Sequence, residues 1–160
     1  MITRFIPLFR AARLLCHLTY GLLLAIPYPM FKQPTRQAIL KRWSNELLEI
    51  LNVQLEITGH LPAATGKGSL LVANHISWLD VFAINAVQPS CFIAKSEVNG
   101  WPLIGMLCRR TQTIFIERDI RRDTMRINSQ AGAQLDIGED VVLFPEANQG
   151  DVINIVRKAF

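Results

Sequence analysis

The apolar residues of this chain recur with two different periods, and each period predicts a kind of element. From Pro34 to Asn52 they recur every three or four residues with charges between them, which predicts an amphipathic helix that begins at the proline. From Val53 to Thr58 apolar and polar residues alternate, as in a strand with one wet face. Residues 69–74 (SLLVAN) and 140–144 (DVVLF) are nearly continuous apolar runs, which predict strands buried on both faces.

Between these two predicted strands, predicted helices alternate with further short strands. We expect helices at residues 78–87, 101–110 and 121–138, the last closed by Gly138, and short strands at 91–94 and 111–117. Strands that alternate with helices at short intervals predict an α/β fold, with a largely parallel sheet and flanking helices. We assign residues 52–160 to this α/β domain and residues 1–51 to an N-terminal helical region that associates with a membrane.

The membrane prediction rests on the charge and hydropathy of the N-terminal quarter. Residues 1–42 hold seven Lys and Arg and no acidic residue, whereas the remainder holds 10 basic and 13 acidic residues. The segment 14–31 is uncharged, and its length is at the lower limit of the roughly 17 to 25 residues that span a bilayer, with Pro27 and Pro29 shortening the helix. Basic flanks and aromatic ends favour an embedded or interfacial helix. The alternatives are a buried core helix and a cleaved signal peptide, for which no A-x-A-like site follows.

Composition excludes several other classes of protein. A chain of 160 residues that is 50% hydrophobic can bury a core, so we do not expect disorder. Cys16, Cys91 and Cys108 are odd in number and lack CxxC spacing, so each is expected to be a small buried residue in a reducing compartment rather than a zinc ligand. The basic residues are interleaved with aliphatic stretches, which argues against nucleic acid as a partner. Nothing indicates a metal or redox cofactor.

Polar residues gather where the predicted strands end, at residues 75–80, at 117–118 and at Glu146. Ligands bind at the carboxyl ends of the strands in open α/β sheets. His75 can accept a proton at neutral pH, and a carboxylate five positions on, Asp80, can fix its tautomer. The alternative is that Asp80 only caps a helix and His75 is a hydrogen-bonded loop residue. Ser77 as a nucleophile would lack the G-x-S-x-G elbow that exposes such a serine.

Four short motifs in order then suggest a family. NHISWLD (74–80) resembles an N-H-x-x-x-x-D block, AKSEV with WPLIG (94–98, 101–105) a K-x-E then P-x-x-G segment, IFIER (114–118) an F-I-x-R block, and VVLFPE (141–146) an F-P-E-G block. Together they resemble the glycerolipid acyltransferase family, typified by 1-acylglycerol-3-phosphate acyltransferases.

The resemblance implies transfer of a fatty acyl group from coenzyme A or acyl carrier protein to the hydroxyl of a lysophospholipid, without a cofactor. The product would be phosphatidic acid, made at the cytoplasmic face of the plasma membrane for phospholipid biosynthesis. By the same likeness His75 would be the general base and Asp80 would orient it. Arg118 would bind the acceptor phosphate and Glu146 its glycerol part.

The likeness stops after Glu146. The family continues with glycine and threonine, whereas this chain reads ANQGD and ends at Phe160, which leads us to expect a C-terminally truncated acyltransferase. Two alternatives remain open at this point. One is a lyso-ornithine lipid O-acyltransferase, which the same motifs also resemble. The other is an inactive membrane-bound pseudoenzyme.

Overall fold

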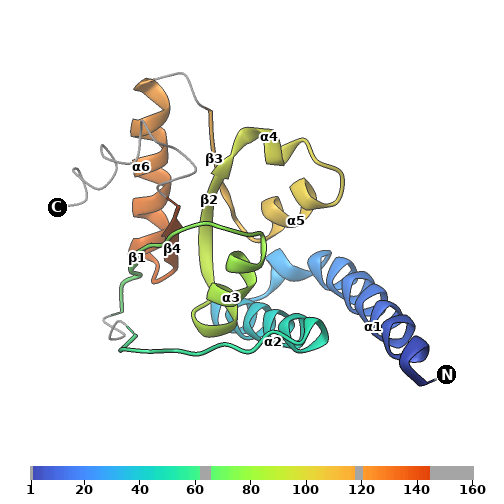
Figure 1. Ribbon diagram of the computed structural model, residues 1–160. Helices are drawn as coiled ribbons and strands as arrows, with labels where there is room; N and C mark the ends of the chain where they lie inside the picture. Colours follow the sequence, from blue (N-terminus) through green and yellow to red (C-terminus); the bar gives the residue numbers. More distant parts are fainter. Residues whose placement is uncertain (1, 62–65, 118–120, 145–160) are drawn as a thin grey trace. The chain divides into compact units, whose positions relative to one another are not determined.

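The computed structural model describes residues 2–61, 66–117 and 121–144 and divides into two compact units (Figure 1). The helical unit comprises Met1–Gly59 and Val81–Pro89, and the sheet unit comprises His60–Asp80 and Ser90–Phe160. The domain boundary that we place at residue 52 stays a prediction.

The helical unit contains α1 (Ile2–Ala25), the short 3-10 helix η1 (Tyr28–Met30), α2 (Gln33–Leu51) and most of α3 (Leu79–Val87). The predicted amphipathic helix is confirmed as α2. It has Pro34 in its first turn, where a missing N–H costs nothing, and it ends at Asn52, whose φ is +58°. α1 extends well before the predicted start at residue 14 and ends just before Pro27, as the proline requires.

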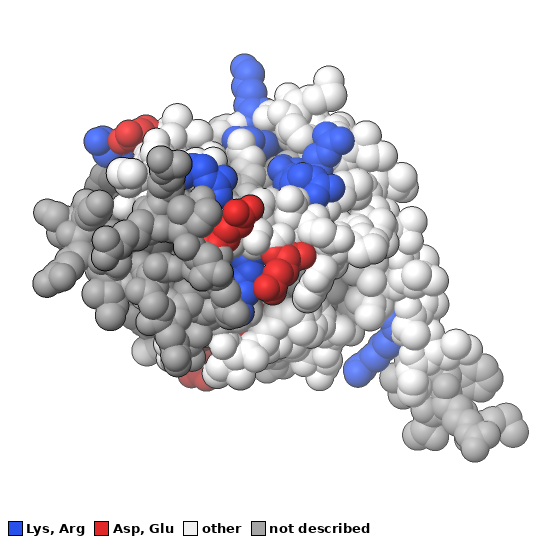
Figure 2. Space-filling view, turned by 90° about the horizontal axis from the view of Figure 1, so that it is seen from above, with Lys and Arg blue, Asp and Glu red and all other residues white. Residues whose placement is uncertain are grey.

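The described side chains of α1 are mostly exposed to solvent. Pro7–Ala25 is long and apolar enough to cross a membrane, yet only 11% of this segment is buried. Leu8, Phe9 and Leu15 are each more than 60% exposed. On the face drawn in Figure 2, the part of α1 that is described is largely uncharged. This exposure argues against the core-helix alternative and supports association of α1 with a membrane.

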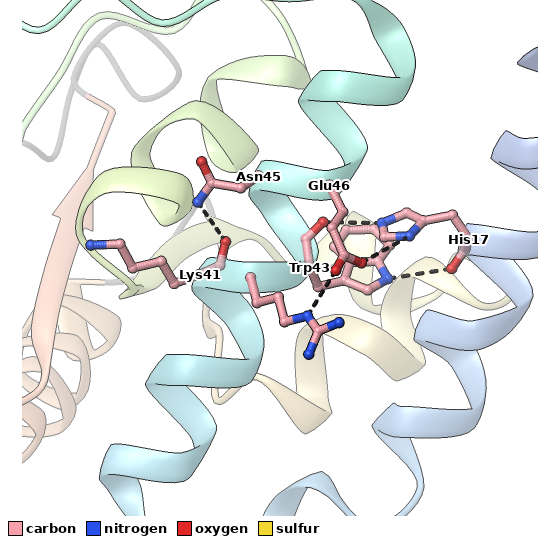
Figure 3. Close-up of polar contacts among 6 residues, drawn as sticks. His17, Lys41, Trp43, Asn45 and Glu46 are labelled. Atoms are coloured by element: carbon pink, nitrogen blue, oxygen red, sulfur yellow. Dashed lines mark hydrogen bonds and ion pairs between the residues drawn. The ribbon is translucent and has the colours of Figure 1, made fainter.

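One polar cluster joins α1 to α2 within the helical unit (Figure 3). The buried His17 places Nε2 3.0 Å from the carbonyl oxygen of Trp43, and Trp43 Nε1 donates to the carbonyl of His17 at 3.3 Å. The two rings stack with centroids 4.7 Å apart, and His17 Nδ1 lies 3.7 Å from Glu46 Oε2. Because a carbonyl only accepts, Nε2 of His17 must carry the hydrogen. The cluster therefore fixes α1 on α2 at one point.

Among the described residues, the sheet unit has four parallel strands in the order β1-β4-β2-β3, which confirms the α/β prediction. β1 is Leu70–Val72, β2 Ser90–Lys95, β3 Ile114–Ile116 and β4 Asp140–Leu143, with α4 (Ser96–Asn99), α5 (Ile104–Arg110) and α6 (Arg121–Asp136) between them. β4 lies inside the sheet, and Val141, Val142 and Leu143 have no exposed surface. The core is formed by Cys91, Ile93, Ile114, Ile116, Ile127, Ala131, Val141 and Leu143.

Three predictions about these elements are wrong. Residues 53–58 form no strand, since Ile57 stays 61% exposed and this segment pairs with no strand among the described residues. β1 is not buried on both faces, because it is an edge strand and Val72 is 55% exposed. Cys16 is exposed on α1, whereas Cys91 is buried as expected, and its burial raises the pKa of the thiol to about 12.

Candidate functional site

The pairing of β1 with β4 brings two segments that are distant in sequence to the same end of the sheet, where the carboxyl ends of the strands lie. Val72 is opposite Leu143, and the N–H of Ala73 still donates to the carbonyl of Leu143 at 3.1 Å after β1 has ended. Because the strands are parallel, both continue from their carboxyl ends at the same edge. His75 and Phe144 both lie there.

His75, in the loop after β1, and Asp80, in the first turn of α3, lie side by side. His75 Nδ1 is 3.3 Å from Asp80 Oδ2, and the two side chains are 34% and 30% exposed. A carboxylate at Nδ1 favours the tautomer with hydrogen on that nitrogen, which leaves the lone pair of Nε2 for a proton from another molecule. The spacing read from the sequence therefore does bring the two groups together. Their catalytic roles remain a proposal.

Asp80 also takes part in the cap at the start of α3. Its Oδ2 accepts hydrogen bonds from the N–H groups of Ile76 at 2.7 Å and Ser77 at 2.8 Å, while the Ser77 hydroxyl accepts from the N–H of Leu79 at 3.2 Å. The bond from the Ser77 N–H to Asp80 is one half of a capping box, with aspartate in the place of the usual glutamate, while the Ser77 hydroxyl binds the N–H of Leu79 rather than that of Asp80. The two interpretations of Asp80 are therefore compatible, because the cap holds the carboxylate where His75 can reach it.

The surroundings of Asp80 lower its pKa below the ordinary value of 3.8. Partial burial acts in the opposite direction, since it disfavours a charge. The two backbone N–H donors, from Ser77 and Ile76, and the neighbouring His75 outweigh that burial. Asp80 is therefore a carboxylate at neutral pH, ready to stabilise a positive imidazolium on His75.

A third residue contacts the pair. The buried ring of Phe144 stacks on His75 with centroids 4.3 Å apart and planes inclined by 27°, and Phe92 of β2 stacks on Phe144 at 5.8 Å. Sequence reasoning missed this contact. Phe144 belongs to the VVLFPE motif, but only the pairing of β1 with β4 shows that its ring reaches His75.

The other predicted site residues are not all placed. Arg118 and Glu146 lie outside the described residues. Glu117 follows β3, which β4 and β2 separate from β1. In the described parts of the chain no three His, Cys, Asp or Glu side chains gather in a way that could hold a metal ion. The absence of a cofactor stays a prediction.

A parallel α/β sheet with a His–Asp pair at the carboxyl ends of its strands is an arrangement suited to general base catalysis. Comparison with known proteins is more specific. The sequence profile described as Acyltransferase matches residues 53–154, and the chain belongs to that family. The resemblance seen in the four motifs is confirmed.

Two relatives illustrate the range within the family. A 1-acyl-sn-glycerol-3-phosphate acyltransferase of Neisseria meningitidis serogroup B is 40% identical over 110 residues, which are 69% of this chain and 43% of the relative. A lyso-ornithine lipid O-acyltransferase of Pseudomonas aeruginosa is 34% identical over 146 residues, 87% of this chain and 55% of the relative. The chain thus spans about half the length of these relatives. No solved structure matches it significantly.

Proposed function

We propose that this chain transfers a fatty acyl group from a thioester to the free hydroxyl of a lysophospholipid, with 1-acylglycerol-3-phosphate as the acceptor. The observation that carries the proposal is the 3.3 Å contact between His75 Nδ1 and Asp80 Oδ2 in a member of the Acyltransferase family. A relative that is 40% identical bears the name of this activity. The donor is acyl-coenzyme A or acyl carrier protein.

His75 acts as the general base in this reaction. Its Nε2 takes the proton from the acceptor hydroxyl while that oxygen attacks the carbonyl carbon of the thioester. When the tetrahedral intermediate collapses, the carbon–sulfur bond breaks and the imidazolium returns its proton to the departing thiolate. The products are an ester and a free thiol. Asp80 stabilises the imidazolium between these two steps and holds the ring in place.

We further propose that Arg118 binds the phosphate of the acceptor and that Glu146 contacts its glycerol part. A guanidinium suits this role because it stays charged and forms paired hydrogen bonds with phosphate oxygens. The exposed apolar surface of α1 supports residence at a membrane, where an amphiphilic acceptor is found. We place the enzyme on the cytoplasmic face.

A second acceptor follows from the other relative. The name of the Pseudomonas aeruginosa protein is lyso-ornithine lipid O-acyltransferase, and its likeness covers 87% of this chain. The chemistry at His75 is the same for both acceptors, since each offers a hydroxyl to a thioester. The two acceptors differ in their head groups. An assay with each lysolipid therefore distinguishes the two activities.

The test is acyl transfer by the full chain in membranes, with a labelled acyl donor on coenzyme A or on acyl carrier protein and each lysolipid in turn. We expect transfer to 1-acylglycerol-3-phosphate and a loss of about 10²- to 10⁴-fold in His75→Ala. The matched control is His60→Ala, because His60 is an exposed loop histidine and its loss should leave the rate unchanged.

Three outcomes decide the matter. An active wild-type chain that keeps its rate in His75→Ala contradicts the catalytic proposal. Transfer to lyso-ornithine lipid alone reassigns the acceptor. A folded wild-type chain that transfers no acyl group with any donor and acceptor favours the inactive, membrane-bound alternative.

A further inference from the structure

The turn between α4 and α5 exposes apolar side chains that the proposed reaction does not use. Residues 99–104, the α4–α5 turn, are exposed without a break. Trp101 is 57% exposed, Leu103 58% and Ile104 46%, with Pro102 between them. A contiguous apolar run of this kind in solvent usually marks a surface that another molecule covers.

The backbone of this turn is strained. Leu103 has φ +62° and ψ −53°, and the N–H of Ile104 donates to the carbonyl of Pro102 at 2.7 Å. These values define the classic γ-turn, which is rare and is especially unfavourable for a residue with a bulky side chain. Because Leu103 lies in solvent, the strain is not compensated by burial of its side chain.

Neighbouring groups hold the turn in this conformation. Arg109 Nη1 donates to the backbone and side-chain oxygens of Asn99 at 3.0 and 2.6 Å. The N–H of Gly105 donates to the carbonyl of Trp101 at 2.9 Å, and a Cβ on Gly105 would overlap the carbonyl oxygen of Asn99. These contacts constrain the backbone of the turn, so the apolar side chains project from a defined backbone conformation.

The turn lies at the same end of the sheet as His75, the end formed by the carboxyl ends of the strands. α4 begins directly after β2 and packs against β2 and β3, so the turn follows the carboxyl ends of these strands (Figure 1). Two further exposed apolar residues, Ile76 at 91% and Trp78 at 60%, follow β1 at the same edge. Exposed apolar side chains thus follow the carboxyl ends of both strands that flank β4, which is the same end of the sheet as the proposed catalytic pair.

The elements that flank the turn, the end of β2, α4 and α5, carry more basic than acidic residues. Arg109 and Arg110 form the last turn of α5 and Lys95 ends β2, against the single acidic residue of α4, Glu97. Figure 2, which looks from above in the view of Figure 1, shows Lys and Arg side chains beside uncharged surface, with some Asp and Glu side chains between them. Exposed tryptophan and aliphatic residues beside basic ones are suited to the surface of an anionic bilayer.

We propose that the α4–α5 turn inserts Trp101 and Leu103 into the head-group region of a phospholipid bilayer. This contact belongs to the sheet unit itself and is additional to any membrane contact of α1. It would hold the edge with His75 against the surface in which lysolipids reside. The basic residues favour a lipid surface, because they complement anionic head groups.

The test uses the intact chain on vesicles of phosphatidylcholine and phosphatidylglycerol whose acyl chains are brominated, since bromine quenches tryptophan fluorescence at short range. Vesicle-bound protein is isolated by flotation before measurement. The chain has three tryptophans, so the contribution of Trp101 is the difference between wild type and Trp101→Phe. We expect Trp101 to account for a large part of the quenched signal.

A matched pair of variants tests the neighbouring side chain. Leu103→Gly removes an exposed apolar side chain and relieves the strained φ, so its Tm should not fall. It should reduce the quenching of Trp101 at least twofold. Ile137→Gly is the control, because Ile137 is 56% exposed but precedes β4 at the opposite, amino edge of the sheet, and its quenching should match wild type.

The proposal is wrong if Trp101→Phe leaves bromine quenching unchanged and aqueous acrylamide quenches Trp101 equally with and without vesicles. It is also wrong if Trp101 is shielded only when acyl carrier protein is added, which would assign the turn to a protein partner. Neither fluorescence measurement requires acyl transfer. The test of membrane insertion therefore gives a result even if the chain is inactive.

Discussion

Phe144 stacks on His75 with the two ring centroids 4.3 Å apart, and it does so from the strand next to the one that precedes the histidine. The contact limits the tilt of the imidazole ring, while Asp80 limits its rotation. Phe144 and Asp80, which are distant from each other in the sequence, thus together orient Nε2 of His75.

Phe144→Leu should therefore weaken acyl transfer without abolishing it. If the loss of an aromatic pair worth about 0.5 to 1.5 kcal/mol acts fully on the transition state, kcat falls roughly twofold to thirteenfold. Phe144→Tyr keeps the ring and should retain most activity. Phe92→Leu is the control, since Phe92 touches Phe144 but is not stacked on His75.

A spectroscopic measurement makes this prediction independent of activity. The chain has three histidines, so a spectrum of isotope-labelled histidine is simple, and His75→Ala assigns the resonance. Stacking under Phe144 should shift the ring protons of His75 by ring current. An unchanged shift in Phe144→Leu would show that the stack is not formed in solution.

Asp80→Asn should lower kcat about 10²- to 10⁴-fold, because the amide cannot stabilise an imidazolium as a carboxylate does. The substitution also weakens the cap of α3. Ser77→Ala separates the two effects, since it removes the hydroxyl cap at Leu79 and leaves the carboxylate in place. It should cost about 0.5 to 2 kcal/mol of stability with little change in kcat. Equal kcat losses in both variants would mean that Asp80 acts only through the helix.

The lowered pKa of Asp80 predicts how stability depends on pH. Its contribution is fully present above the ordinary carboxyl value of 3.8, where the group is ionised in both folded and unfolded chains. As the pH falls below that value the unfolded chain takes up the proton first, so the contribution declines and is lost once the folded group is also protonated. Urea unfolding of wild type and Asp80→Asn in detergent measures this. The difference in unfolding free energy should shrink from about pH 6 to about pH 3, and a constant difference would contradict the prediction.

Two helical glycines should respond in opposite ways to alanine. At Gly21 of α1 a Cβ would lie 2.5 Å from Nε1 of Trp43, so Gly21→Ala must displace the indole that stacks on His17. We expect a loss of about 1 to 3 kcal/mol. At Gly132 of α6 no atom lies within 4 Å of the added carbon. Gly132→Ala should therefore stabilise the protein by about 0.5 to 1 kcal/mol. Thermal unfolding in detergent compares the two, and a similar Tm for both would mean that α1 does not pack on Trp43.

Much of this fold was predictable because the signals are local. The period of apolar residues indicates α2, and the nearly continuous apolar runs at residues 69–74 and 140–144 indicate β1 and β4. The contact between His75 and Asp80 was also predictable, since His75 lies in the short loop before α3 and Asp80 in the first turn of that helix.

Features that depend on strand order were not predictable. Consecutive strands are usually neighbours, which would place β1 beside β2, yet β4 lies between them. This order makes β1 an edge strand and puts Phe144 against His75. Residues 53–58 alternate as a strand does, but alternation alone does not supply a pairing partner. The strain at Leu103 has no sequence signal, because leucine is an unfavourable residue for a γ-turn.

The position of β4 also has a consequence for the newly made chain. Residues 70–80 leave the ribosome long before residues 140–144, and within the described sheet β1 pairs with β4 alone. During most of synthesis the segment that carries His75 thus has neither its neighbouring strand nor the ring that stacks on the histidine. The surroundings of the proposed catalytic pair are thus completed late, by the last strand among the described residues, although His75 and Asp80 themselves are made much earlier.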